Sequence, residues 1–189
     1  MKLQDNLSTT LATPRPRGVT LVGIAGFAAA LALASQIAIP LPGTPVPLTL
    51  QPMLVVLAGL WLGPSAAAAS MILYLTAGAL GLPVFTPLGA PGLARLVGPT
   101  GGYLLAYPLA AAATGWLALR ADGLLGRIGA AAAGMLVIYA GGLAQLALIT
   151  GSLQQAALLG ALPFALLDAA KAVVAAALAP ARPTPRALG

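Results

Sequence analysis

Long apolar stretches separated by short polar or proline-rich segments run along the whole chain. They predict six helical spans, at residues 19–39, 52–62 (with a start near Leu48), 65–80, 103–119, 128–150 and 163–179. About 20 apolar residues are enough for a helix to cross a bilayer. The pattern therefore predicts an all-α integral membrane protein with a six-helix membrane domain at 19–179, between tails at 1–18 and 180–189. The first apolar stretch continues past any small-residue cleavage pattern, so we expect it to be retained rather than removed as a signal peptide.

The segments between these spans carry most of the turn-forming residues. Residues 40–52 hold five prolines, and residues 81–102 hold ten glycines or prolines. Proline lacks a backbone N–H and fixes φ, so both segments are expected to be stiff loops rather than helices. Residues 120–127 form a charged turn, and residues 151–162 form a connector or a short interfacial helix. Pro163 is expected at the first position of the last helix, where proline is favoured.

The distribution of positive charge favours six spans over five. Spans two and three are short and could form one broken helix. With six spans and a cytoplasmic N-terminus, seven positive residues lie inside and only Arg95 lies outside, whereas five spans split them four to four. Lys and Arg accumulate on the cytoplasmic side of membrane proteins. Both termini are therefore expected in the cytoplasm, with both glycine- and proline-rich loops and the start of the last span on the outer face.

Composition narrows the possible classes of protein. The chain is 60% hydrophobic and 6% charged, against about 25% charged in a soluble domain, so it is expected in a lipid bilayer. It has no Cys, no His and no Glu, so no metal site, no cofactor and no disulfide is expected. The net charge of +6 comes from positive residues dispersed at span ends, which encodes topology and does not indicate nucleic acid.

The last span contains the only charges that lie within an apolar stretch, Asp168 and Lys171. They are three residues apart, so a helix places them on one face. A charge at membrane depth is costly, at roughly 2.5–3.5 kcal/mol on insertion scales, and usually faces a partner or a ligand. The pair is therefore a candidate binding site that opens to the outer face. The alternative is an ion pair that only neutralises itself.

Arg95, the one outer cation, is free to join this site, or it contacts a lipid headgroup. The three charges sum to +1, which a ligand with one carboxylate would neutralise, and Asp168 could accept N–H bonds from the ligand. Tyr74, Phe85 and Tyr103 offer stacking surface, or they lie at the membrane interface as aromatic residues commonly do.

An enzyme is the alternative from another class, namely a membrane-embedded enzyme that modifies a small acid or a lipid. No nucleophile stands beside a base in this sequence, so the chain is not expected to be an enzyme. It has no phosphate-binding motif of the form GxxxxGK[ST] either. Any ATP-driven transport would therefore need an ATPase on another subunit.

Four motifs in the chain resemble one known family. IPLPGTPVPLTLQ (39–51), GLPVF (81–85), LVGPTGGYLLAYPLA (96–110) and a PF…DxxK pattern (163–171) resemble the BioY family. Its members are the biotin-binding S components of energy-coupling factor (ECF) transporters. The resemblance runs from about residue 21 to residue 178, with the motifs in the family's order.

The resemblance implies a six-helix S-component fold in the cytoplasmic membrane of a bacterium or archaeon. It implies capture of biotin from outside and docking to a transmembrane T component driven by two ABC-type ATPases. The sequence does not decide whether the chain works alone or with these partners. The ligand contacts implied by the matching motifs are Asp168, Lys171, Arg95, Gln51 and Tyr74. The docking face implied on the first helix comprises Ala25, Ala28, Ala29 and Ala32, although an alanine-rich composition alone would also give this pattern.

Overall fold

The computed structural model describes residues 17–180, and these residues form helices and loops without strands. The six longer helices are α1 (Arg17–Ser35), α2 (Gln51–Leu62), α3 (Pro64–Ala79), α5 (Gly101–Ala118), α6 (Gly123–Thr150) and α8 (Ala165–Leu178). Two short helices, α4 (Leu93–Val97) and α7 (Leu153–Gly160), lie between them. The all-α prediction is confirmed. The predicted tails lie almost wholly outside the described residues, and α1 includes residues 17 and 18.

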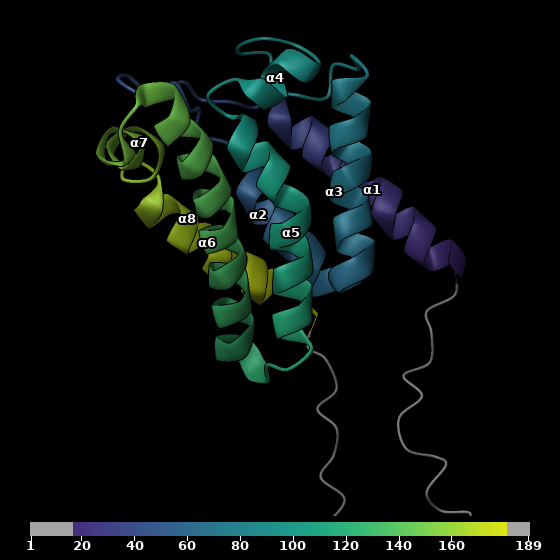
Figure 1. Cartoon of the computed structure of the whole chain (residues 1–189). Helices are drawn as coiled ribbons and strands as arrows, with labels where there is room; N and C mark the ends of the chain where they lie inside the picture. The colour runs from purple at the N-terminus through teal and green to yellow at the C-terminus, as the bar shows by residue number, and fades with distance from the viewer. Residues whose placement is uncertain (1–16, 181–189) are drawn as a thin grey trace, which may run out of the picture.

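Consecutive long helices run in opposite directions between the two ends of the bundle. Figure 1 shows α4, α7 and the segment that joins α1 to α2 together at the top. The short connections from α2 to α3 and from α5 to α6 lie at the other end. Both glycine- and proline-rich segments and the start of α8 therefore share one end of the molecule.

Gly63 separates α2 from α3. Its φ of +83° lies in a region that residues other than glycine rarely adopt. The next residue, Pro64, begins α3. The chain reverses direction at this point (Figure 1). The two short apolar stretches are thus separate helices, α2 and α3, while the number of membrane spans stays a prediction.

The first helix ends at Ser35 rather than at Ile39, so its predicted end is wrong. The Ser35 hydroxyl donates to the Val84 carbonyl at 2.5 Å, and the Gln36 amide donates to the Phe85 carbonyl at 3.2 Å. Side chains that bond to other backbone groups offer an alternative to continuing the helix. These two bonds tie the end of α1 to the segment that follows α3.

Two predicted helix starts are also wrong. α6 begins at Gly123 rather than at Ile128. The charged Arg127 lies inside the helix, where its Nε donates to the Gly123 carbonyl at 3.3 Å. A long charged side chain can thus be part of a helix that extends beyond the apolar run.

α8 begins at Ala165, and Pro163 lies in the turn between α7 and α8 rather than at the first position of α8. The two helices meet at 58°.

The segment between α1 and α2 is an ordered loop, as its prolines predicted. An isolated antiparallel bridge pairs Ile39 with Leu48, with two backbone bonds of 2.9 Å. The Thr44 hydroxyl donates to the Leu159 carbonyl of α7 at 2.6 Å. The second proline- and glycine-rich segment, in contrast, contains the helix α4, which the sequence did not predict. Both segments are fixed to the helices around them.

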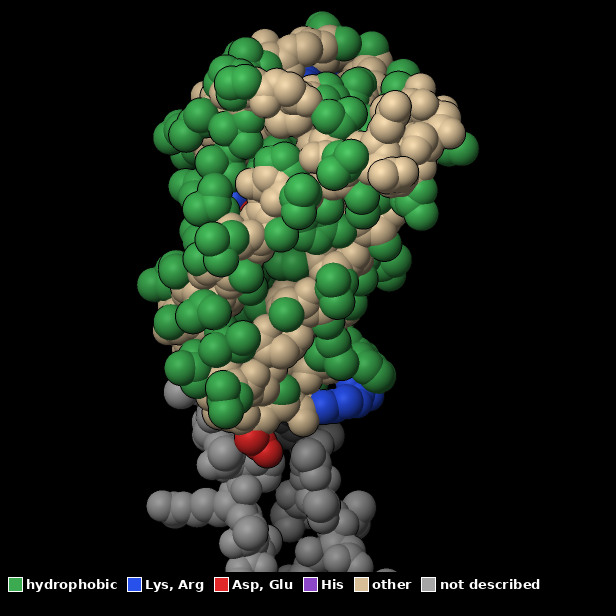
Figure 2. All heavy atoms as spheres, turned by 90° about the vertical axis from the view of Figure 1, so that its left-hand side faces the viewer, with side chains coloured by type: hydrophobic (Ala, Val, Ile, Leu, Met, Phe, Trp, Pro, Cys, Tyr) green, Lys and Arg blue, Asp and Glu red, His purple; other side chains and the backbone are tan. Residues whose placement is uncertain are grey.

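The outside of the bundle is largely apolar. Figure 2 shows green side chains along the length of one face, with red and blue side chains gathered at the lower end. Among the described helices, α6 is the one that is long and apolar enough to cross a bilayer alone, and α7 with α8 passes the same test as a bent pair. α2 and α3 have 12 and 16 residues. At 1.5 Å per residue they are about 18 and 24 Å long, which is less than a hydrocarbon core of about 30 Å.

Candidate ligand-binding site

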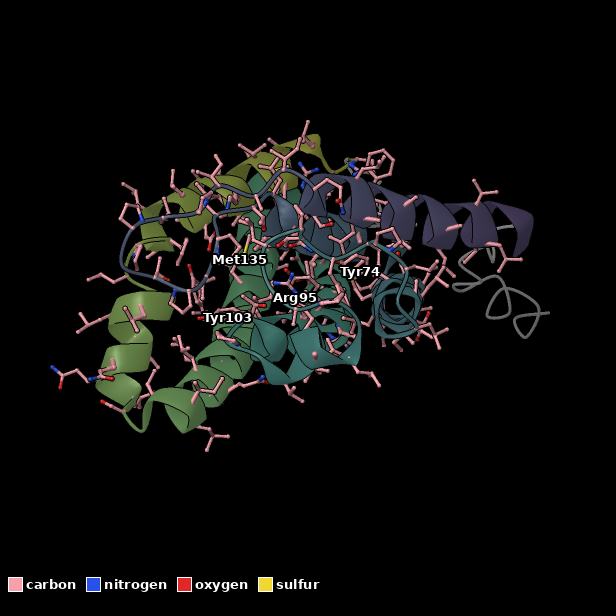
Figure 3. All side chains as sticks on the ribbon, turned by 90° about the horizontal axis from the view of Figure 1, so that it is seen from above. Tyr74, Arg95, Tyr103 and Met135 are labelled. Atoms are coloured by element: carbon pink, nitrogen blue, oxygen red, sulfur yellow. The ribbon has the colours of Figure 1, made fainter. Side chains whose placement is uncertain are left out.

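A cavity lies beside the two loops, which contribute residues 46–49, 85 and 86 to its lining. It contains about 680 Å³ of empty space, counting the part that is open to solvent. All five residues predicted to contact a ligand line this cavity, namely Gln51, Tyr74, Arg95, Asp168 and Lys171. They come from four helices and are up to 120 residues apart in the chain. Seen from above, Arg95 lies between Tyr74 and Tyr103 near the centre of the bundle (Figure 3).

The charged pair on α8 lies in the wall of the cavity. Lys171 Nζ is 2.7 Å from Asp168 Oδ1, so the two residues form an ion pair. Each also bonds to another segment of the chain. Lys171 donates to the Thr49 carbonyl at 2.7 Å, and Tyr139 of α6 donates to Asp168 Oδ2 at 2.6 Å. The pair therefore holds α8 against the loop before α2 and against α6, while it remains part of the cavity surface.

Gln51 and Tyr74 form a second polar contact in the wall. The Gln51 side-chain amide donates to the Tyr74 hydroxyl at 2.8 Å, and both residues are buried. The Tyr74 ring meets the Phe85 ring edge to face, with 5.4 Å between the centroids. This geometry is favourable for aromatic pairs. The Gln51 carbonyl oxygen still has its lone pairs.

Arg95, on α4, is only 6% exposed. Its guanidinium donates to the Thr86 carbonyl at 2.5 Å and to the Leu88 carbonyl, while its Nε has no partner among the described residues. Burial lowers the pKa of this group from its usual value, and the nearby Tyr74 acts in the opposite direction. The guanidinium is charged at neutral pH in proteins, so the cavity contains one positive charge that no carboxylate balances.

Gly89 makes room for this arrangement. Its φ is +103°, and a Cβ at this position would lie 2.8 Å from Arg95 Nη1. A residue with a side chain would be strained in its backbone and would press on the guanidinium. The turn at Gly89 is therefore part of what holds Arg95 over the cavity.

A cleft between the two loops lies next to the cavity. It is bounded by Pro40 and Pro45 on one side and by Ala90 and Ala94 on the other. The residues that line both the cleft and the cavity are Pro47, Arg95 and Thr100. The two spaces therefore meet at Arg95, at the end of the molecule where the loops lie.

Sequence reasoning missed part of the cavity wall that α6 provides. Met135, Ile138 and Tyr139 all line the cavity. They stand at spacings of three and four residues, so they share one face of the helix. The available signal was Tyr139, a polar aromatic residue near the middle of a long apolar run. Tyr103 and Phe85, named as possible stacking surface, do line the cavity.

The four alanines expected on a docking face differ in their exposure. Ala25 and Ala29 are exposed on α1, but Ala28 is 8% exposed and lies in the core. Ala32 is partly buried against the same core. In this structure Ala28 is therefore not available for contact and Ala32 is only partly so, while the docking role of the four residues stays a prediction. The exposed face of α1 carries Ala25 and Ala29 together with Val22 and Leu33, which are 74% and 72% exposed.

Among the described residues, a bundle of apolar helices holds a mostly apolar cavity that carries three charged side chains beside two loops, an arrangement typical of membrane proteins that bind a small ligand. The model of the BioY family matches residues 8–186 of the chain. The chain belongs to the BioY family.

Two curated relatives cover most of the chain. A probable biotin transporter BioY of Pyrococcus horikoshii is 39% identical over 165 residues, which are 87% of this chain and 95% of the relative. The biotin transporter BioY of Thermotoga maritima is 37% identical over 153 residues, covering 81% and 89% of the two chains.

A solved structure has a similar fold. It is the crystal structure of the S component for biotin from an ECF-type ABC transporter. The TM-score is 0.79 at 26% identity, over 89% of this chain and 93% of that one. The fold and the family thus agree along nearly the whole length of the chain.

Proposed function

We propose that this chain is the biotin-binding subunit of a transporter that takes up biotin across the cytoplasmic membrane. The observation that carries the proposal is the cavity, in which Asp168, Lys171 and Arg95 lie among aromatic side chains with a summed charge of +1. The relatives, a probable and an established biotin transporter, and the similar S component for biotin support the same ligand. The membrane-embedded enzyme that composition left as an alternative has no support in this family.

The chemistry of biotin matches these groups. Its carboxylate would neutralise the charge of Arg95, which lines the cavity. Its ureido N–H groups would find the carboxylate of Asp168 and the Gln51 carbonyl oxygen as acceptors. Its apolar bicyclic body would contact Tyr74, Phe85 and Tyr103. A ligand pocket of this kind is mostly apolar with a few well-placed polar groups.

Titration of the purified chain with biotin by calorimetry tests the ligand. We expect saturable binding with one ligand per chain. The neutral amide of biotin is the matched control and should bind more weakly, because it cannot neutralise Arg95. An absence of binding at micromolar biotin would contradict the proposal.

We also propose that transport requires an ECF T component and two ABC-type ATPases. The chain itself has no Walker motif, and the similar solved structure is one subunit of an ECF-type ABC transporter. Cells that express the chain alone should therefore bind biotin without concentrating it, and cells that also express the module should accumulate it. Concentrative uptake by the chain alone, in cells that lack every ECF subunit, would show that it works without the module.

A further inference from the structure

The carboxylate of Asp168 is held by two donors from two different helices. Lys171, one turn along α8, bonds to Oδ1 at 2.7 Å, and Tyr139 of α6 bonds to Oδ2 at 2.6 Å. We propose that Tyr139 is a positioning residue for ligand binding, which fixes the Asp168 carboxylate so that its unused lone pairs face the cavity. The inference rests on the proposed function, since it concerns the same site.

The two bonds determine the orientation of the carboxylate. The χ2 torsion of aspartate has a broad distribution, so a hydrogen bond to one carboxylate oxygen does not fix the position of the other oxygen. A donor on each oxygen fixes the plane of the group. Lys171 is itself held by the Thr49 carbonyl, at 2.7 Å. Of the two donors, Tyr139 is the one that α6 contributes, so it fixes Asp168 relative to the cavity wall that α6 forms.

Both bonds leave capacity for a ligand. An ionised carboxylate has about four lone-pair sites, and the protein donors occupy two of them. Asp168, Lys171 and Tyr139 all line the cavity, and Asp168 is only 7% exposed. A ligand N–H therefore meets a carboxylate that is already oriented, and it does not have to order the group itself. Pre-organisation of this kind raises affinity because less freedom is lost on binding.

The chain offers an unusually clean probe of this contact. It has three acidic residues, Asp5, Asp122 and Asp168, and no glutamate. Labelling the full-length protein with aspartate that carries ¹³C at the side-chain carboxyl should thus give three carboxyl signals in an NMR spectrum. The Asp168 signal is the one that disappears in Asp168→Asn.

The test uses Tyr139→Phe, which removes the hydroxyl alone. We expect the Asp168 signal to move in the absence of ligand while the other two stay in place. We expect affinity for biotin to fall about tenfold, the effect of losing one hydrogen bond to a charged group. The matched control is Thr150→Val. It removes a hydroxyl at the end of the same helix, where that hydroxyl bonds to the Leu146 carbonyl at 2.9 Å and to the backbone of Ser152, and Thr150 does not line the cavity. It should leave both the Asp168 signal and the affinity unchanged.

A double substitution separates positioning from a general effect on the fold. If Tyr139 acts through Asp168, Tyr139→Phe should cost no further affinity in a chain that already carries Asp168→Asn. Two independent losses that multiply would overturn the inference, and so would an unmoved Asp168 signal. A wild-type chain that fails to bind biotin would overturn the proposed function and this inference together. A wild-type chain that binds, with equal affinity in Tyr139→Phe, would overturn this inference alone.

Discussion

At the scale of single residues, the polar groups of the cavity are also the bonds that hold its walls together. Lys171 of α8 bonds to the carbonyl of Thr49, and Gln51 of α2 bonds to Tyr74 of α3. Arg95 bonds to two carbonyls of the segment after α3. A substitution in this set therefore acts on both the ligand and the wall, and an experiment must measure both.

The Asp168→Asn substitution should weaken biotin binding while the chain stays folded. An asparagine presents one carbonyl oxygen and one NH₂ group, so it cannot accept from Lys171, Tyr139 and a ligand in the same way. We expect a loss of about 2–4 kcal/mol of binding free energy, as for truncating one member of a buried charge pair. Calorimetry measures the affinity, and thermal unfolding of the unliganded chain is the control. Unchanged affinity with lower thermal stability would show that Asp168 is a structural residue.

Sequence alone singled out the residues whose presence in an apolar segment is costly. Asp168 and Lys171 stood out because charges are rare at membrane depth. Tyr139 did not, because an uncharged tyrosine in an apolar run is far less costly than a charge, and only the fold places its hydroxyl 2.6 Å from Asp168. The prediction that these residues contact a ligand is still a prediction.

At the scale of helices, Gly142 of α6 leaves room for the ring of Tyr103, which lines the cavity. A Cβ on Gly142 would lie 2.2 Å from the Tyr103 ring, so this ring fits against the helix only because Gly142 has no side chain. The Tyr103 hydroxyl donates to the Gly160 carbonyl of α7 at 2.9 Å. Tyr103 is thus held between two helices, with its ring in the wall of the cavity.

The Gly142→Ala substitution should therefore displace Tyr103 and weaken biotin binding. Overpacking of this kind costs about 1–3 kcal/mol of stability, which a thermal unfolding experiment would detect. Gly129→Ala on the same helix is the matched control, because a Cβ there meets no atom within 4 Å. That change should leave binding intact and stabilise the helix by about 0.5–1 kcal/mol. Equal effects of the two substitutions would show that the Tyr103 contact is unimportant.

The exposed face of α1 is the proposed docking face for a T component. Helices in lipid associate by close contact between small residues, so a bulky side chain should keep the partner away. Ala29→Trp, at an exposed position, should abolish co-purification with the T component and leave biotin affinity unchanged.

Two further substitutions delimit this docking prediction. Ala28→Trp should instead lower thermal stability, because Ala28 lies in the core. Leu148→Trp, at an 85% exposed position of α6, should affect neither docking nor stability. Normal co-purification of Ala29→Trp would place the docking face elsewhere on the chain.

The positions of the six long helices could be predicted from the apolar runs, and so could the ends of α2 at Leu62 and of α6 at Thr150, but the end of α1 and the starts of α6 and α8 could not. α1 ends where Ser35 and Gln36 bond to a segment almost 50 residues away in sequence, which no local pattern reveals. α4 was missed because its surroundings are rich in glycine and proline. The stripe of alanines on α1 could be recognised, but which alanines face the core depends on how the helix is rotated in the bundle.

At the scale of the whole molecule, the proposed topology has six spans with both termini in the cytoplasm. The chain has no cysteine, so single cysteines can report on it without background. Ala90→Cys lies in the loops at one end, and Asp122→Cys lies in the turn between α5 and α6 at the other (Figure 1). A membrane-impermeant thiol reagent should label Ala90→Cys in intact cells and should label Asp122→Cys only after the membrane is permeabilised.

The opposite labelling pattern would show that the cavity opens to the cytoplasm, and labelling of both positions in intact cells would contradict a membrane-spanning bundle. The sequence could predict this arrangement because positive residues accumulate at particular span ends. It could not predict how short helices such as α2, of 12 residues, fit into the bundle, since that depends on tilt and on neighbouring helices.

The bonds from Ser35 and Gln36 connect the helix proposed for docking to a segment of the cavity wall. Through them the end of α1 is joined to the carbonyls of Val84 and Phe85, and Phe85 lines the cavity. If a docked partner favours one position of α1, it favours one position of Phe85 as well, and the affinity for the ligand changes by some factor. Thermodynamic linkage requires the ligand to change the affinity for the partner by the same factor. A subunit with bound biotin and a subunit without it would then differ in their affinity for a shared T component, and the ratio of the two affinities would be set by this coupling free energy.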